Sequence, residues 1–331
     1  MEPLAVDLLI SVLGPFYVEL AGHPVAGFRT AKVRALLAYL AVESQRAWSR
    51  ATLADLLWPD LPQKDAQSNL RNAISNLRKV IGDPRRDPPY LLLSQDTLQL
   101  NPNRPVGLDV NECLTLISTA SKAGETGPQE MKNLEKALAL YRGDFLEGFS
   151  IDSARFQEWV LLKSELVRRQ ALEALRRLTA AYQESGDLER ALQHARRWLA
   201  IEPWDESAYR ALMRIFLRRD QRNAALAQYE ACRERLKRDL AVEPEPATTR
   251  LYEQIRSGQV DTEALKVESL SSTQASQVPA FLRGRRLSQS EPHLFVARQG
   301  EMVRLEAELE AAVQAKGCIF FVTGDPGSGA G

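Results

Sequence analysis

The clearest pattern of apolar and polar positions lies between residues 63 and 82. Apolar residues recur there at the spacing i, i+3, i+4, i+7, which predicts an amphipathic helix that ends at Gly82 and Pro84. The opposite face carries amide, hydroxyl and basic side chains. Such groups hydrogen-bond base edges and phosphates, and a helix of this width fits a major groove; an ordinary solvated face is the alternative interpretation. The polar positions are Gln67, Asn69, Arg71, Asn72, Ser75, Asn76, Arg78 and Lys79.

Three segments before this helix have patterns of their own. Residues 8–20 are rich in Val, Phe and Tyr and predict two short strands interrupted by a Gly-Pro pair. Residues 31–42 carry an apolar stripe, and Thr30 can cap the helix that they predict. Ser49 opens a further short helix, which stops before Pro59.

The segment after the long helix predicts a hairpin, because residues 90–93 and 98–100 flank a polar tip at residues 94–97. Strands, three helices and a terminal hairpin form the order of a winged helix-turn-helix. In that arrangement the third helix enters the major groove and the hairpin approaches the backbone. We therefore predict a winged-helix DNA-binding domain over residues 1–106. Its candidate DNA-binding residues are Gln67, Ser68, Asn69, Arg71, Asn72, Ser75, Arg78, Lys79, Arg85 and Arg86.

Charge is concentrated on the proposed reading helix. The whole chain has a formal net charge of zero, and residues 1–108 hold 12 Lys and Arg against 10 Asp and Glu. Residues 63–82 alone hold four basic residues against a single acidic one, Asp65. This is where an electrostatic footprint for DNA belongs. Because the excess is modest, we expect a monomer to bind weakly and to gain affinity by dimerising or by binding at repeated half-sites.

Composition bounds the class of protein. The 331 residues allow two or three domains, and 44% hydrophobic with 26% charged residues is typical of a soluble globular chain. The sequence has no run long enough to span a membrane and no signal peptide, so we expect a cytoplasmic protein. Cys113, Cys232 and Cys318 lie far apart and predict reduced thiols rather than a metal site. Neither they nor the three dispersed histidines form a catalytic set, so no enzymatic activity is expected.

Residues 109–255 have an almost purely helical texture. Trp159, Trp198 and Trp204 are expected to fill the grooves between these helices, an aromatic ligand cage being the alternative. The predicted helical stretches are 137–141, 155–177, 179–184, 188–201, 207–218 and 223–240.

An internal repeat refines this prediction. Residues 181–192 align with residues 215–226 at an offset of 34 residues, which is the tetratricopeptide period. A turn falls at Gly186 in the first copy and at Asp220 in the second, and an alanine follows each turn by five positions. We predict an all-α tetratricopeptide-like domain over residues 107–256, so that the chain as a whole is mainly α.

Several motifs in these two parts resemble one known family. ALALYRGDFLEGF (137–149), the helix WVLLKSELVRRQALEAL (159–175) and VEPEPATTRLYEQI (242–255) are similar to the bacterial transcriptional activator domain of the SARP/AfsR-like regulators. The first hundred residues resemble the OmpR-type winged-helix domain that precedes it in that family. This resemblance implies transcription activation at direct-repeat promoter sites. It also implies that the helical domain contacts RNA polymerase or a second copy of the chain.

The remaining residues have a different character. Residues 257–292 are rich in Ser, Gln, Thr and Glu, which predicts a flexible linker. Residues 293–331 resemble the opening of a STAND-type P-loop NTPase, with a Gly-rich loop at Gly324, Gly327 and Gly329.

This loop lacks the groups that bind nucleotide phosphates. Ala330 stands where the P-loop lysine belongs, and Gly331 stands where the Mg²⁺-binding Ser or Thr belongs. We therefore expect no cofactor in this chain and no ATP hydrolysis. The resemblance implies that the chain is the N-terminal part of a longer regulator, which would bind ATP and Mg²⁺.

Two functions remain open at this point. The favoured one is a bacterial DNA-binding transcription regulator whose partners are double-stranded DNA, RNA polymerase and a second copy of itself, with no membrane partner. The alternative is a STAND-type signalling scaffold whose winged helix serves protein–protein contacts. The many asparagines on the reading face keep that alternative open. A salt-dependent shift of a promoter fragment would separate the two, since a scaffold would show none.

Overall fold

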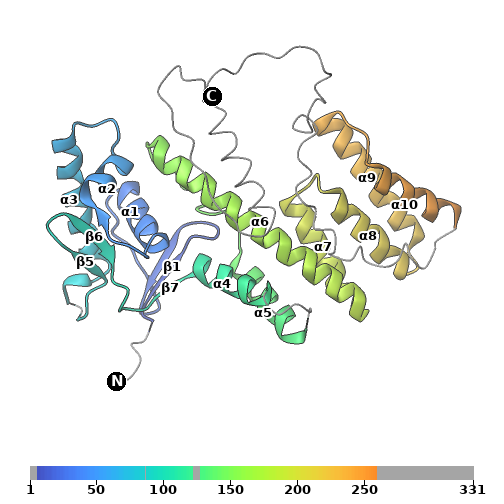
Figure 1. The fold of residues 1–331 in the computed structure, drawn as a ribbon, viewed down its shortest axis with the longest axis horizontal. Helices are drawn as coiled ribbons and strands as arrows, with labels where there is room; N and C mark the ends of the chain where they lie inside the picture. The colour runs from blue at the N-terminus through green and yellow to red at the C-terminus, as the bar shows by residue number, and fades with distance from the viewer. Residues whose placement is uncertain (1–5, 86, 122–126, 259–331) are drawn as a thin grey trace, which may run out of the picture. The chain divides into compact units, whose positions relative to one another are not determined.

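The computed structural model describes residues 6–85, 87–121 and 127–258 (Figure 1). The expectations for Arg86, for Cys318, for the Gly-rich loop and for nearly all of the 257–292 linker lie outside these residues. None of the helices in the described ranges is long and apolar enough to cross a membrane.

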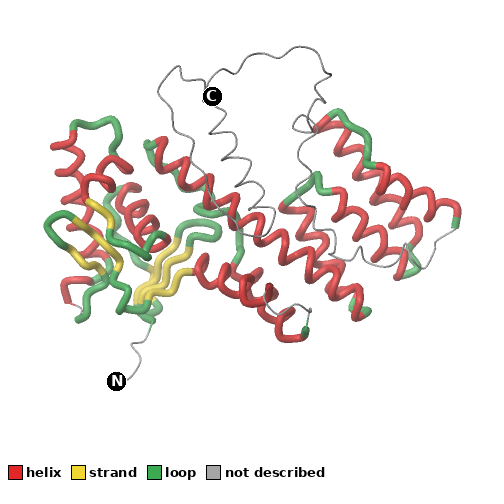
Figure 2. The backbone as a smooth tube through the Cα atoms, viewed as in Figure 1, coloured by secondary structure: helices red, strands yellow, loops and turns green. Residues whose placement is uncertain are grey.

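The first part of the chain forms a winged helix. Its strands make two small sheets, one in the order β3-β2-β1-β7 and one in the order β4-β6-β5 (Figure 2). The elements are β1 (Leu8–Ser11), β2 (Tyr17–Leu20), β3 (His23–Pro24), α1 (Ala31–Val42), β4 (Trp48–Ser49), α2 (Arg50–Leu57), α3 (Gln63–Val80), the 3-10 turn η1 (Asp83–Arg85), β5 (Leu91–Leu93), β6 (Thr97–Leu100) and β7 (Val106–Leu108).

The two residues that were predicted to cap α2 and α1 differ in their hydrogen bonds. Ser49 caps α2 as expected, because its hydroxyl accepts a hydrogen bond from the Thr52 amide at 3.0 Å. Thr30 occupies the N-cap position of α1 as predicted, but its side chain makes no capping hydrogen bond. The Thr30 carbonyl accepts a hydrogen bond from the Val33 amide at 3.2 Å.

The wing is the predicted hairpin. Strands β5 and β6 pair antiparallel with Leu93 opposite Leu98. The Ser94 amide donates to the Thr97 carbonyl across the tip at 3.1 Å, and the Ser94 hydroxyl accepts from the Thr97 amide at 2.9 Å. The two-residue strand β4, which pairs with β6, was not predicted because two residues are too few to show an alternation.

The second part of the chain is helical. Helix α6 is one continuous element, although the sequence predicted two stretches separated at residue 178. Thr179 lies within this helix, and its hydroxyl donates to the Leu175 carbonyl one turn earlier at 2.7 Å. The elements are α4 (Asp109–Ser121), α5 (Pro128–Leu140), α6 (Ala154–Ser185), α7 (Leu188–Ile201), α8 (Glu206–Arg218), α9 (Arg222–Leu240) and α10 (Pro246–Ser257).

The 34-residue repeat corresponds to successive helix pairs in which α6, α7, α8, α9 and α10 each pack on the next (Figure 1). Gly186 and Asp220 both adopt the left-handed conformation, with φ of 82° and 58°. Ala191 and Ala225 are fully buried where the helices approach.

Two of the three tryptophans behave as predicted. Trp198 is buried and Trp159 is half-buried among aromatic rings. Trp204 remains 43% exposed, so its predicted packing role is wrong. Its indole N–H donates to the Asp239 carboxylate at 3.2 Å at the surface.

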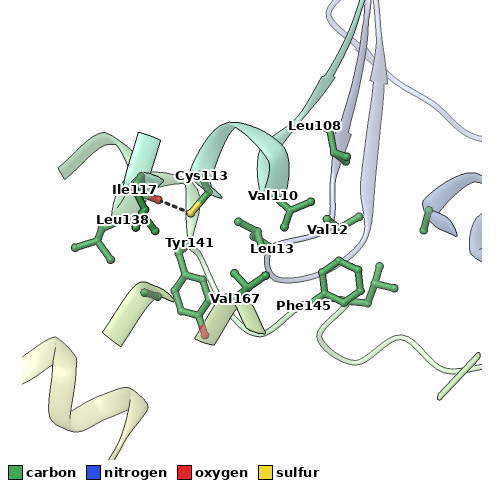
Figure 3. Close-up of a cluster of buried hydrophobic side chains, with 14 of the residues drawn as sticks. Val12, Leu13, Leu108, Val110, Cys113, Ile117, Leu138, Tyr141, Phe145 and Val167 are labelled. Atoms are coloured by element: carbon green, nitrogen blue, oxygen red, sulfur yellow. Dashed lines mark hydrogen bonds between the residues drawn. The ribbon is translucent and has the colours of Figure 1, made fainter. Parts of the chain in front are cut away.

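One core continues from the winged helix into the helical part (Figure 3). The loop at residues 142–149 lies along the β1–β2 turn, where the Leu146 amide donates to the Val12 carbonyl at 2.7 Å and the Gly14 amide donates to the Asp144 carbonyl at 2.9 Å. Glycine suits both sides of this contact. Gly14 has φ of +103°, and a Cβ on Gly143 would lie 3.3 Å from the Gly14 Cα. This contact explains why the RGDFLEGF segment is compact without being helical.

Helix α6 adds a second connection to the winged helix. The Ser153 hydroxyl donates to the Leu56 carbonyl at 2.6 Å. One oxygen of Glu43, at the end of α1, accepts from the Trp159 indole at 2.9 Å and lies 2.7 Å from the Lys163 ammonium. Burial raises the pKa of Glu43, but the hydrogen bonds from Lys163 and Trp159 outweigh it and hold that pKa below its ordinary value.

Replacing Glu43 with glutamine is therefore expected to lower the free energy of unfolding at neutral pH by about 1–3 kcal/mol, because the charge-assisted hydrogen bonds are lost. A lowered folded-state pKa stabilises the fold above the unfolded pKa, and this contribution disappears as the pH falls through the folded pKa. The difference between the chain and Glu43→Gln should thus shrink between pH 7 and about pH 3 in urea unfolding. A difference that stays constant with pH would contradict this account.

Candidate nucleic-acid interface

Helix α3 separates into a buried and an exposed face. Leu70, Ile74 and Leu77 are at most 4% exposed and pack into the core of the winged helix. The polar positions lie on the other side. Gln67, Ser68, Arg71, Asn72, Ser75 and Lys79 are exposed, whereas Asn69 and Arg78 are half-buried.

A groove of about 450 Å³ lies between the second half of α3 and the wing. Arg71, Ser75, Arg78 and Lys79 line it from α3, and Leu93 lines it from β5. Arg50, the first residue of α2, adds a fourth cation. None of the described residues that line this groove is acidic. Basic side chains from two helices therefore gather in one groove, an arrangement that favours a polyanion.

Arg50 joins the groove to the wing. Its guanidinium donates to the Ser94 carbonyl at 2.9 Å, and its amide donates to the Asp96 carbonyl at 2.8 Å. The tip of the hairpin is thus held by the start of α2. A cation at the first position of a helix opposes the helix dipole, so some other contact must favour it there.

The buried Asp83 side chain connects the end of α3 to the wing. One oxygen of this fully buried carboxylate accepts from the amides of Tyr90 and Leu91 at 2.6 and 3.0 Å. The other accepts from the Arg78 guanidinium at 2.9 Å. Arg78 is consequently both a groove residue and a structural partner, and part of its charge is already neutralised.

Replacing Asp83 with alanine is expected to destabilise the winged helix by about 1–3 kcal/mol, because the Tyr90 and Leu91 amides would be left buried without an acceptor. Urea unfolding monitored by circular dichroism measures the loss. Asp96→Ala removes an exposed carboxylate from the same hairpin and should change stability by less than about 0.5 kcal/mol. Equal effects of the two substitutions would show that the Asp83 contacts contribute nothing.

A second groove lies on the other side of α3, and this one is lined by Asn69 and Asn72. Arg29, Thr30 and Lys32 face it from the start of α1. Asn69 and Asn72 are therefore not in the same groove as Arg71 and Lys79. Helix α3 forms the ridge between the two.

The structure corrects one position of the proposed reading face. Asn76 is 9% exposed, and its amide group accepts from the Arg29 amide at 3.0 Å and donates to the Gly27 carbonyl at 3.2 Å. It fastens the loop before α1 to α3 and is unable to meet a base edge. The sequence pattern alone placed it on the polar face.

The other predicted residues fall at the margins. Gln67 and Ser68 are exposed on the first half of α3, outside both grooves. Arg85 is exposed in η1, next to Pro84 of the wing-side groove. Sequence reasoning missed Arg50, Arg29 and Lys32. Of these three residues only Arg50 could have been recognised from the sequence, because a positive charge at the first position of a helix is unfavourable.

Metal ligands and reactive thiols are the other groups to consider among the described residues. They contain no group of three or more His, Cys, Asp and Glu that could hold a metal ion. Cys113 and Cys232 are buried free thiols, and burial raises their pKa to about 11 and about 12. Both therefore remain protonated at neutral pH.

Two family models match consecutive parts of this chain. Residues 28–95 match the model described as transcriptional regulatory protein, C terminal. Residues 108–256 match the model of the bacterial transcriptional activator domain.

Named relatives extend the match across both parts. The transcriptional regulator RedD of Streptomyces coelicolor is 29% identical over 252 residues, which are 74% of this chain and 69% of RedD. The regulatory protein AfsR of the same organism is 28% identical over 282 residues, 83% of this chain but 27% of AfsR. A solved structure of Mycobacterium tuberculosis EmbR, in complex with a low-affinity phosphopeptide, shares the fold with a TM-score of 0.64 at 23% identity. That match covers 79% of this chain and 68% of the EmbR chain.

Proposed function

Because this chain belongs to the SARP/AfsR-like transcriptional regulators, we propose that it activates transcription by reading promoter repeats with α3. In this proposal α3 lies in the major groove and the β5–β6 hairpin lies along the adjacent backbone. The observation that carries the proposal is the groove between α3 and the wing, which gathers Arg50, Arg71, Arg78 and Lys79 and has no acidic residue among the described residues that line it, although Arg78 is paired with the buried Asp83. We assign DNA reading to residues 1–106 and assembly to residues 107–256.

The two sides of α3 suggest a division of roles. Asn72 and Ser75 are exposed on the ridge between the grooves, and with the half-buried Asn69 they are the side chains that we assign to base edges. Arg71, Lys79 and Arg50 are assigned to phosphates, which fix the position of the protein without reading sequence.

The helical domain is proposed to contact RNA polymerase or a second copy of the chain. The support is its attachment to the winged helix through two connections, the 142–149 loop and the start of α6. Such an attachment holds the helical surface in one orientation to the bound DNA. A protein with this role works in the bacterial cytoplasm, on the nucleoid.

The test is selection of genomic DNA fragments by the purified chain. We expect enrichment of fragments that share a repeated motif, with half-sites about one or two helical turns apart. Enriched fragments should lose affinity steeply between about 50 and 200 mM salt. If no motif were enriched and no salt-dependent complex formed, the chain would instead fit a signalling scaffold whose winged helix contacts proteins.

We also propose that this chain is not an enzyme and that its DNA binding does not respond to ATP. Ala330 and Gly331 stand at the positions where a P-loop has the lysine for the phosphates and the hydroxyl for Mg²⁺. Titrating the selected DNA with and without ATP and Mg²⁺ should therefore give the same affinity. A change of tenfold or more, equivalent to about 1.4 kcal/mol of coupling, would mean that the segment still binds nucleotide.

A further inference from the structure

The second groove beside α3 contains two cations that have no role in the groove between α3 and the wing. This second groove has a volume of about 550 Å³ and lies between α3, the start of α1 and residues 150–152, which lead into α6. Arg29 and Lys32 are its basic residues, and neither has an ion-pair partner within the described ranges. Two such cations at the wall of an open groove attract an anion.

Both cations are held in place relative to α3. The Arg29 amide donates to the side-chain oxygen of Asn76 at 3.0 Å, so the backbone that carries the exposed Arg29 side chain is fixed on α3. The ammonium of the half-buried Lys32 lies 5.4 Å from the centre of the Trp58 ring, within the range of a cation–π contact. An anion beside α3 can therefore meet both cations without a rearrangement of the backbone.

DNA in the proposed mode of binding has phosphates on both sides of α3. The major groove is about 12 Å wide and is bordered by the backbones of both strands, so a helix that lies in it has one strand on each side. The groove that gathers Arg50, Arg71 and Lys79 lies on one side of α3. The groove that contains Arg29 and Lys32 lies on the other side, where the second strand is expected to pass.

We propose that Arg29 and Lys32 form a second phosphate site, which binds the backbone of the DNA strand opposite to the one held beside the wing. The inference rests on the proposed function, because it requires α3 to lie in the major groove, and it adds the site for the second strand. Each strand of a half-site is then held by its own set of cations. A single copy of the chain is thereby fixed in register and orientation on one half-site.

One acidic residue lies in the same groove and belongs to the segment that starts the helical domain. Asp152 is exposed and lines the groove beside Ser153, whose hydroxyl connects this segment to α2 by donating to the Leu56 carbonyl at 2.6 Å. Two cations face this single carboxylate, so the charge of the groove stays positive. Because Asp152 repels a phosphate there, the position of the helical domain limits the affinity of the second site.

The first test compares variants of the 331-residue chain on one DNA fragment from the genomic selection. Arg29→Gln with Lys32→Gln should weaken binding at least about tenfold and lower the slope of log affinity against log salt by about 2, because two phosphate contacts are lost. Lys132→Gln with Lys136→Gln is the matched control, since it removes two exposed charges from α5 and should change neither quantity. If the Lys32 substitution disturbs folding, Arg29→Gln alone should still lower the slope by about 1.

Asp152→Asn tests the same groove with the opposite sign. Removing the carboxylate should strengthen binding about threefold or more at low salt, and the gain should shrink as salt screens the repulsion. Asp96→Asn removes an exposed carboxylate that lines neither groove and is the comparison for Asp152→Asn. Equal gains from the two substitutions would show a general effect of charge and contradict a phosphate beside Asp152.

DNA in which a neutral methylphosphonate replaces one phosphate separates the two strands. For the parent chain, neutralising a contacted phosphate on either strand should weaken binding. The Arg29/Lys32 variant should lose this sensitivity on one strand only. A variant with alanine at Arg71 and Lys79 should lose it on the other strand.

The proposal is overturned if the Arg29/Lys32 variant binds with the affinity of the parent, as it would if the groove held a small anion or only water. It is also overturned if this variant and the Arg71/Lys79 variant lose sensitivity on the same strand. In both cases salt-dependent binding by the parent would leave the proposed function standing. A parent chain that forms no salt-dependent complex would overturn the proposed function and this inference together.

Discussion

Replacing Arg71 and Lys79 together with alanine is expected to weaken DNA binding by at least about thirtyfold, because each lost contact costs on the order of 1 kcal/mol or more. Both side chains are exposed at the groove between α3 and the wing, and they make few contacts in the free protein. Arg71 donates a 3.4 Å hydrogen bond to the Gln67 carbonyl, and Lys79 has no ion-pair partner among the described residues. The unfolding midpoint of the double variant should therefore stay close to that of the parent chain.

A matched control separates this contact from a general effect of charge. Lys132 and Lys136 are exposed on α5, and replacing both with alanine removes the same two charges from the helical domain. That variant should bind DNA with unchanged affinity. Arg78 is a poorer choice for the experiment. Its replacement would also remove the ion pair with Asp83 and so change stability as well as DNA binding. Equal affinity of the Arg71/Lys79 variant and the parent would show that this groove does not hold DNA.

Replacing Leu77 with alanine is expected to lower the free energy of unfolding by about 2–5 kcal/mol. Leu77 is fully buried on the face of α3 that meets the core, so truncation leaves a cavity. Urea unfolding measures the loss, and DNA binding should fall only in proportion to the unfolded fraction. Val80→Ala on the same helix is the comparison, since Val80 is half-buried and should cost less. A Leu77→Ala chain as stable as the parent would contradict the observed phase of α3.

The best-predicted feature was the phase of α3. Its buried positions, Leu70, Ile74 and Leu77, and its exposed positions, such as Arg71 and Lys79, follow from the helical period alone. The hairpin could also be predicted from the sequence, because a polar tip separates two short apolar runs. The 34-residue repeat predicted the turns at Gly186 and Asp220, since both need a residue that tolerates positive φ.

Features set by distant contacts were not accessible from the sequence. Helix α4 and most of α5 were missed, and strand β7 forms only because Val106–Leu108 pairs in parallel with β1, about a hundred residues earlier. Asn76 belongs to the predicted polar face, but the loop at residues 27–29 engages both the oxygen and the nitrogen of its side-chain amide. Arg50 enters the groove only because the wing folds back onto α2. For β7, Asn76 and Arg50 the deciding partner lies far away along the chain.

In the proposed mode of binding, α3 and α2 beside the wing hold DNA phosphates through Arg50, Arg71 and Lys79. This mode of binding is tested most directly by the salt dependence of binding to one selected fragment, for the parent chain and for the Arg71/Lys79 double-alanine variant. Each phosphate contact contributes about 0.9 to the slope of log affinity against log salt, so the account predicts that the variant's slope is smaller by about 2. Equal slopes for the two proteins, whether or not their affinities differ, would contradict this mode of binding.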